Sequence, residues 1–388
     1  MTTTKKWLIG GGLLVVAAAI GGYTYSAKAA DLGADGIGDL EERVATLEAE
    51  VARKGNRKIR LVISGEVSKA LFWHDIDGLP GANKLRVIDN PHSGTKLRFS
   101  GDAKIGASAS AGFMVELGFD ETAGNLLGLG SAVNDMTVRH SVVWINTAVG
   151  KVSVGRTSTA TDGIAEIDLA NTNIASLPMS IEPLWTQSGL PGIGLGIVNP
   201  VGFDGGRANI VRYDTPNFGG FVASASWGGG QSVSGDDVWD AALRYAGEFG
   251  GLRVAAGVGY RSENLDTFGA SDMTTLTGSA SMLHTTTGLF LSGYAGQQDS
   301  HPLWGDVQMW QVRGGLHRNF FGVGATSVFA EYGDHKLKDL GVDSSFVGGG
   351  ITQSIDAAAM DIFVSYRAYD IGGSFDAATA LAGARIKF

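Results

Sequence analysis

KIRLVISGEV, residues 58–67, alternates apolar and polar side chains along most of its length. Successive side chains of an extended strand point to opposite faces, so one face is apolar and the other polar. TKLRFSGDAKI, residues 95–105, repeats the pattern. Alternation alone would also fit a soluble β-sandwich, but strands in globular proteins usually have about five or six residues. Longer strands with one apolar face are typical of a transmembrane β-barrel, with lipid outside and water inside.

Short turn segments recur along the chain and predict the number of strands. They lie near Gly106, Gly150, Gly219, Gly250, Gly288, Gly322 and Asp356-Ala357. Most intervals fit two strands of about ten residues joined by one longer loop. Seven short turns therefore predict an all-β fold, a 16-stranded antiparallel transmembrane barrel over residues 58–388. Aromatic residues at both ends of the strands, among them Phe72, Trp73, Trp144 and Phe249, match the expected interfacial girdles.

The N-terminus predicts export. Lys5 and Lys6 precede an apolar run from Trp7 to Ile20, and Ala27-Lys28-Ala29 follows as a cleavage site, so residues 1–29 are predicted to be a signal peptide. An uncleaved membrane anchor is the alternative, but the run is short for a helix of about 20 residues. Without residues 1–29 the chain has 27 basic and 39 acidic residues, a net charge of −12. Such a surface does not favour nucleic acid as a partner.

Residues 30–57 are predicted to form a periplasmic linker with a short coiled coil. Apolar residues recur at steps of three and four over residues 37–51, which makes two heptads. Two heptads are marginal as an isolated helix. The seam therefore either joins several chains or belongs to a solvated linker helix.

One interval is about twice as long as the others, because 69 residues separate Gly150 from Gly219. The excess, residues 157–208, contains TATDGIAEIDLANTNI and too many apolar residues to remain in solvent. A barrel of sixteen strands encloses an aqueous channel. We therefore expect this third loop to fold inward and constrict the lumen.

The charged residues of the constriction follow from this model. The loop carries four acidic candidates, Asp162, Glu166, Asp168 and Glu182. Six basic residues lie at strand positions that we expect to face inward, and they are the candidates for the opposite wall: Arg60, Lys96, Arg98, Arg139, Arg212 and Arg367. Opposed charges in a narrow passage create a transverse field that orients dipolar solutes and penalises apolar ones.

Several segments together resemble the alphaproteobacterial members of the Gram-negative general porin family. They are ARKGNRK, ISGEVSKALFWHD, VIDNPHSGTKLRFSG, GRTSTATDGIAEIDL, RYDTPNFGGF and the terminal Phe388. The resemblance implies a homotrimer in the outer membrane, surrounded by lipid and lipopolysaccharide, that passes small hydrophilic solutes by diffusion. It also implies that Phe388 belongs to the signal read by the outer-membrane assembly machinery.

Other chemistry has less support in the sequence. Cysteine is absent and the seven histidines are dispersed, so zinc sites and an enzyme are not expected. Asp162, Glu166 and Asp168 could offer oxygen ligands to Ca²⁺, although their spacing matches no EF-hand loop.

Three functions remain open for a barrel of this kind. A diffusion channel is the first, a substrate-selective channel the second, and a structural or adhesive barrel the third. The acidic loop favours a mild preference for cations, which inward arginines would reverse.

Overall fold

The computed structural model describes residues 59–77, 84–120, 135–177, 203–229, 237–264, 272–301, 305–339, 341–372 and 375–388. The predicted signal peptide, the predicted coiled coil and Glu182 lie outside the described residues. Among the described residues, no helix has the length and apolar character needed to cross a membrane.

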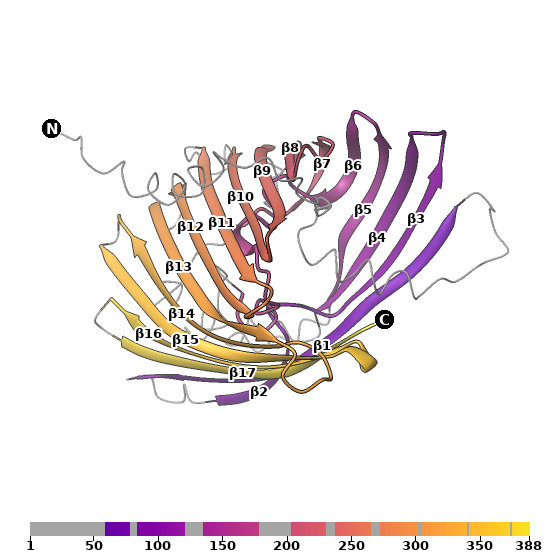
Figure 1. Ribbon diagram of the computed structural model, residues 1–388. Helices are drawn as coiled ribbons and strands as arrows, with labels where there is room; N and C mark the ends of the chain where they lie inside the picture. The colour runs from indigo at the N-terminus through magenta and orange to yellow at the C-terminus, as the bar shows by residue number, and fades with distance from the viewer. Residues whose placement is uncertain are drawn as a thin grey trace.

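The described chain is almost entirely β-strand (Figure 1). The strands are β1 (Arg60–Ile76), β2 (Lys84–Asp89), β3 (Lys96–Lys104), β4 (Ser110–Asp120), β5 (Asp135–Thr147), β6 (Gly150–Ser158), β7 (Arg207–Asp214), β8 (Phe221–Gly229), β9 (Asp237–Phe249), β10 (Leu252–Glu263), β11 (Met273–His284), β12 (Leu289–His301), β13 (Gly305–Arg318), β14 (Thr326–Leu337), β15 (Val342–Ile355), β16 (Met360–Ile371) and β17 (Phe375–Lys387). In the described part of the chain, two short 3₁₀ helices accompany them, η1 (Ile164–Glu166) and η5 (Asp356–Ala358).

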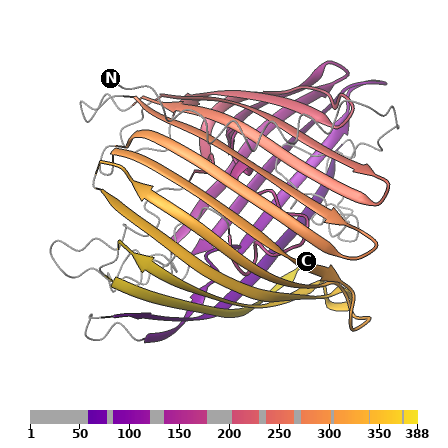
Figure 2. The same cartoon turned by 60° about the vertical axis from the view of Figure 1, so that its left-hand side comes forward.

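The strands close into one antiparallel barrel of sixteen strand positions (Figure 2). β2 and β3 are two parts of one position, because both pair with β1, β2 along Lys69–His74 and β3 along Arg60–Glu66. β17 pairs with the other edge of β1 and closes the ring. Closure leaves no unpaired edge in lipid, where backbone polar groups find no other partner. The predicted fold class is confirmed.

Side chains alternate between an apolar outer face and a polar inner face. In β7, Val211 and Tyr213 are exposed on the outside, whereas Arg212 and Asp214 are buried on the inside. The seven predicted short turns all join consecutive strands, from β3–β4 around Gly106 to β15–β16 at Asp356–Ala358. Phe249 belongs to an outward-facing position. Trp144 shares the inward phase of Val142 and pairs with the buried Ser153, and Phe72 is only 1% exposed and packs inside the barrel, so the predicted interfacial places of Trp144 and Phe72 are wrong.

The segment after β6 turns into the barrel and lies along the inner wall (Figure 1). We call residues 159–177 the inner loop. Near its start, Ala160 and Ile164 pack with Ala242 of β9. Farther along, Ile174 packs with Phe72 of β1, Ile88 of β2 and Phe363 of β16, strands that flank the closure of the ring between β17 and β1. The predicted inward fold of the third loop is therefore observed for these described residues.

Two glycines in β10 make room for the loop. A Cβ at Gly257 would lie 2.7 Å from Cδ1 of Ile164 and 2.9 Å from Cδ1 of Ile167. A Cβ at Gly259 would lie 2.6 Å from Cγ2 of Thr161. Only residues without a side chain allow this close approach of loop and strand.

Gly257→Leu should therefore displace the inner loop while the barrel still forms. Overpacking of this kind costs about 1–3 kcal/mol, so we expect a lower melting temperature and a changed single-channel conductance. Ala256→Leu is the matched control, since Ala256 lies next to Gly257 but faces outward. Equal conductance and melting temperature for the two variants would contradict the inference that Gly257 makes room for the inner loop.

Candidate constriction site

The root of the inner loop is held by charged side chains from β9. The Asp240 carboxylate accepts hydrogen bonds from the backbone N–H groups of Ala160 and Thr161, at 3.0 and 2.8 Å. The Arg244 guanidinium donates to the carbonyl oxygens of Ala160 and Asp162, at 2.8 and 2.7 Å. Buried backbone groups that leave a strand must find new partners. Asp240 and Arg244 supply them where the chain turns inward.

Arg212 of β7 belongs to the same anchor. It is 2% exposed, and its guanidinium donates to the carbonyl oxygens of Ser158 and Thr159, each at 2.9 Å. It also pairs with Asp214 at 2.9 Å. Its side chain therefore binds the loop root, and its expected place on the pore wall is wrong.

Asp168 shapes the middle of the loop. One carboxylate oxygen accepts the N–H of Ala170 at 2.9 Å, and the other accepts the N–H of Thr172 at 2.6 Å and of Asn173 at 3.3 Å. The side chain is buried, so the expectation that it faces water in the constriction is wrong. Asp168 closes a local turn, which is a common use of aspartate in loops.

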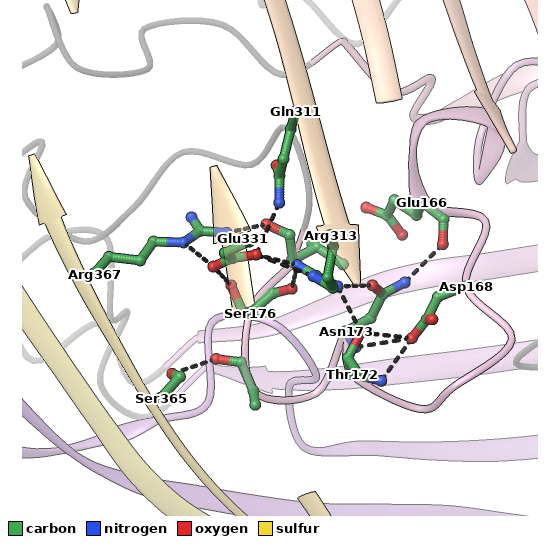
Figure 3. Close-up of polar contacts among 12 residues, drawn as sticks. Glu166, Asp168, Thr172, Asn173, Ser176, Gln311, Arg313, Glu331, Ser365 and Arg367 are labelled. Carbon is green, nitrogen blue, oxygen red and sulfur yellow. Dashed lines mark hydrogen bonds and ion pairs between the residues drawn. The ribbon is translucent and has the colours of Figure 1, made fainter. Parts of the chain in front are cut away.

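The far end of the described loop is fixed by a buried ion cluster on β13, β14 and β16 (Figure 3). Glu331 accepts hydrogen bonds from Arg313 at 2.8 Å and from Arg367 at 2.7 Å, and all three residues are at most 4% exposed. Arg313 also donates to the Thr172 hydroxyl at 2.7 Å and to the Ser176 carbonyl oxygen. We call Arg313, Glu331 and Arg367 the tip anchor.

Arg367 was expected on the pore wall opposite the loop, and the structure places it under the loop. Its guanidinium donates to Glu331 and, at 3.3 Å, to the carbonyl oxygen of Leu177. On the neighbouring side, Asn90 lies in the interruption between β2 and β3, and its amide donates to the Ile174 carbonyl oxygen at 3.0 Å. The inner loop is thus hydrogen-bonded to the barrel wall at β9, at β13 and β16, and at Asn90 after β2.

A row of cations lies on β3 and β5. Arg98 and Arg139 both pair with Glu116 of β4, at 2.6 and 2.7 Å, and Lys96 lies 3.4 Å from Glu66. The side chains of Lys96, Arg98 and Arg139 remain 23%, 13% and 31% exposed, so water reaches them. We call these three residues the basic wall.

A β-bulge brings Arg139 to this wall. The pairing of β4 with β5 shifts between Glu116 and Leu117, where Glu116 faces His140 and Leu117 faces Val138. Arg139 is the extra residue, and a bulge of this kind redirects a side chain. Both Arg139 and His140 therefore reach Glu116, at 2.7 and 3.9 Å.

Three carboxyl groups gather at the loop root: Asp162, Glu166 and Asp204. Asp204 accepts the N–H groups of Gly163 and Ala165 at 2.6 and 2.9 Å. Arg207 lies 4.0 Å from Asp162 and donates to His140 at 3.2 Å. Arg207 therefore connects the loop carboxylates with the wall.

The three carboxyl groups differ in their protonation. Burial and the Asp162 charge raise the pKa of Glu166 to about 7, against the opposing effect of Arg207, Arg139 and Lys96. Burial and the charges of Glu166 and Asp162 raise the pKa of Asp204 above its usual range. Burial alone would also raise the pKa of Asp162, but Arg207 and hydrogen bonds outweigh it and lower this pKa to about 2. Asp162 thus carries the negative charge at neutral pH.

The remaining predicted residues lie apart from this constriction. Arg60 is exposed at the end of β1, opposite Asp102 near the first short turn. Phe388 follows β17, where its backbone exchanges hydrogen bonds with Gly65. Of the predicted set, Asp162, Glu166, Lys96, Arg98 and Arg139 therefore remain as described constriction candidates.

The calcium hypothesis finds no support in the geometry. Both Asp168 oxygens are occupied by backbone N–H groups, and Asp162 faces Arg207. Within the described ranges, no group of three or more histidine or acidic residues is arranged to hold a metal ion.

Sequence reasoning missed most of the anchoring residues. Asp240, Arg244, Arg313 and Glu331 all lie on the inner face of long strands. The available signal was a charged residue at an inward strand position, but that signal does not separate a pore-lining residue from a loop anchor.

Comparison with known proteins agrees with this geometry. The family model described as Gram-negative porin matches residues 64–382. The anion-selective porin from Comamonas acidovorans shares 17% identity, with 85% of this chain and 100% of that chain covered and a TM-score of 0.60. OmpF from Salmonella typhi, solved with daunomycin, shares 15% identity over 87% and 100% of the chains, with a TM-score of 0.56. The in-vitro folded trimer form of OmpT from Vibrio cholerae shares 16% identity over 85% and 99%, with a TM-score of 0.55. No curated protein matches the sequence.

Glu331→Gln should release the tip of the inner loop. It leaves the buried Arg313 and Arg367 without a carboxylate, and breaking a buried pair typically costs about 3–5 kcal/mol. We expect a lower melting temperature and a noisier, larger single-channel conductance. Glu248→Gln is the control, because its pair with Arg253 is 45% and 55% exposed and such pairs contribute about 0–1 kcal/mol. An unchanged conductance and melting temperature in Glu331→Gln would contradict the tip anchor.

Proposed function

Because the chain belongs to the Gram-negative porin family, it forms an outer-membrane channel for passive diffusion, and we propose that its constriction lies between the inner loop and the basic wall. The single observation that carries this proposal is the placement of opposite charges. Arg207 lies 4.0 Å from Asp162 of the loop, and Arg98 and Arg139 of the basic wall lie on Glu116. Charges of opposite sign on two sides of a narrow water path produce a transverse field.

Such a field selects small hydrophilic solutes. Water and dipolar solutes align in it, while an apolar solute must displace oriented water and gains no compensating interaction. This property requires no stacked aromatic path and no substrate-specific pocket. We therefore place general diffusion ahead of a substrate-selective channel, and ahead of a structural or adhesive barrel.

We further propose a preference for anions. Lys96, Arg98, Arg139 and Arg207 supply four cations, whereas Asp162, Glu116 and Glu66 supply three carboxylates and Glu166 is partly protonated at neutral pH. Charge at the narrowest point outweighs the net charge of the chain. This proposal replaces the mild cation preference expected from the acidic loop.

We also propose that the chain assembles as a homotrimer. Three barrels would associate in the outer membrane among lipid and lipopolysaccharide, with the coil of residues 37–51 on the periplasmic side. Phe388 would carry the signal for the assembly machinery. Its backbone pairing with Gly65 places it at the end of the barrel seam between β17 and β1.

A planar lipid bilayer with a salt gradient tests the channel and its selectivity together. We expect stepwise conductance and a reversal potential of the sign that indicates anion preference. The triple change Lys96→Gln, Arg98→Gln and Arg139→Gln should move the reversal potential toward cation preference, while Arg60→Gln should leave it unchanged. A folded, heat-modifiable barrel without conductance would contradict the proposed function.

Glu166 should make the selectivity depend on pH near neutrality. Its raised pKa, about 7, means that it is mostly uncharged at pH 6 and mostly negative at pH 8. Anion preference should therefore weaken as the pH rises between these values. Reversal potentials of the wild type and Glu166→Gln measure this, because the amide does not titrate. The same pH dependence in Glu166→Gln would show that another group is responsible.

A further inference from the structure

Four side chains form a row across the wall, from the basic wall to the root of the inner loop. They come from four neighbouring strands: Glu116 from β4, His140 from β5, Thr157 from β6 and Arg207 from the start of β7 (Figure 1). Glu116 and His140 are cross-strand partners, and Arg207 leads on to Asp162, 4.0 Å away. His140 therefore lies between the cations that bind Glu116 and the charged root of the loop.

The hydrogen bonds of His140 define its protonation state. Arg207 donates its Nε–H to Nε2 of His140 at 3.2 Å, so this nitrogen must present a lone pair. The other ring nitrogen, Nδ1, lies 3.1 Å from Oγ1 of Thr157. In a neutral imidazole one nitrogen accepts and the other donates. His140 is therefore neutral, with its hydrogen on Nδ1 and directed at Thr157.

Glu116 is the alternative partner for this ring, and the distances are against it. Its Oε1 is 3.9 Å from Nε2 of His140, which is beyond hydrogen-bond range. Both oxygens of Glu116 are already engaged, Oε2 by Arg98 at 2.6 Å and Oε1 by Arg139 at 2.7 Å. A protonated His140 would also place a positive charge directly against Arg207, and two cations at this distance repel each other. The surroundings therefore favour the neutral ring.

Burial separates the residues that hold from the residue that is held. His140 and Thr157 are only 3% and 7% exposed, whereas the Arg207 side chain is 29% exposed. A buried ring that is bonded at both nitrogens keeps its orientation. A long arginine side chain has many rotamers, and a fixed acceptor selects among them. His140 thus orients Arg207 at its Nε atom, while the outer edge of the guanidinium faces Asp162 and water.

We propose that His140 is a positioning residue for ion selectivity. It holds Arg207 between the basic wall and Asp162, so that the guanidinium acts on ions in the water path. Without this acceptor, Arg207 would close on Asp162 as a direct pair, and the two charges would largely cancel for a passing ion. The inference rests on the proposed constriction and its anion preference, and it assigns the residue that orients one of the cations.

A bilayer measurement on His140→Leu tests this role. The change removes the acceptor and leaves a side chain of similar size in the buried place. At pH 7.5, where Glu166 has the same charge in both proteins, the reversal potential should shift toward cation preference. The anion-to-cation permeability ratio should fall roughly twofold, which is the effect of one elementary charge acting through water over about 8 Å. An unchanged ratio would overturn the proposal.

His284→Leu is the matched control for this measurement. It also breaks a histidine–threonine hydrogen bond, to Thr287 at 2.8 Å, but it lies at the end of β11 near a short turn. Its permeability ratio should equal that of the wild type. A shift as large as that of His140→Leu would show that the loss of any such bond changes the selectivity, and would overturn the proposal.

Two further variants separate positioning from a general loss of structure. His140→Gln keeps an amide oxygen that can accept from Arg207, so it should restore most of the wild-type ratio. Arg207→Gln should lower the ratio by itself, and adding His140→Leu to it should have no further effect, because residues that act through one hydrogen bond are not additive. Additive effects, or a His140→Gln variant shifted as far as His140→Leu, would overturn the proposal.

Nitrogen-15 NMR of the histidine rings tests the protonation state in the full barrel in detergent micelles. The chain has seven histidines, and the signals that disappear in His140→Gln identify those of His140. At pH 7.5 we expect a protonated Nδ1 and an unprotonated Nε2. Thr157→Val, which removes the hydroxyl acceptor, should shift the hydrogen toward Nε2. An imidazolium ring, or a hydrogen on Nε2 in the wild type, would overturn the proposal.

The two kinds of measurement separate this inference from the proposed function. A barrel that conducts with anion preference, but has the same permeability ratio in His140→Leu, overturns the role of His140 and leaves the channel intact. A barrel that does not conduct contradicts the proposed function, and the ring signals alone then decide whether His140 holds Arg207.

Discussion

Every backbone N–H and C=O group in a lipid-embedded strand needs a partner from another strand, and the rest of this molecule follows from that requirement. It is met by closing the sheet, with β17 returning to pair with β1. A ring of sixteen strand positions is too wide for side chains to fill. The chain must therefore supply a further segment to narrow the lumen, and it does so by directing residues 159–177 inward.

The inner loop does not pair with itself as β-strands do, so its backbone N–H and C=O groups need hydrogen-bond partners on the barrel wall. Asp240 and Arg244 satisfy them at the root, and Arg313 does so near the tip. Charged side chains are costly to bury unless they are paired and hydrogen-bonded. Here the strand carboxylates and guanidinium groups are neutralised partly by one another, as Glu331 is by Arg313 and Arg367. These contacts hold the inner loop, whose described part contains only the short helix η1, against the wall.

The fold was predictable from the sequence because a period of two is a local property. Each strand has its own alternation of apolar and polar residues, and each short turn contains a glycine or a small polar segment. The constriction was only partly predictable. Strand phase correctly put Arg98 and Arg212 on the inner face, yet one lines the basic wall and the other binds the loop root. That difference depends on the path of the loop, which is set by distant residues such as Gly257 and Asn90.

Asp168 illustrates the same point for the acidic residues. Its charge and spacing resemble those of Asp162, but its carboxylate closes a turn of the loop itself. Arg139 stays a proposed pore-wall residue, and a bulge in β5 is what brings it to Glu116. A bulge adds one residue to the count and leaves no clear mark in the alternation of a single sequence.

The attachment of the inner loop also has a mechanical side. It is bonded to β9 at one end, to β13 and β16 at the other, and to Asn90 beyond the seam of the ring. A hollow cylinder flattens easily when squeezed from the side, whereas one with an internal brace keeps its cross-section. The loop is such a brace, so we expect it to resist flattening of the passage when the lateral pressure of the surrounding membrane rises.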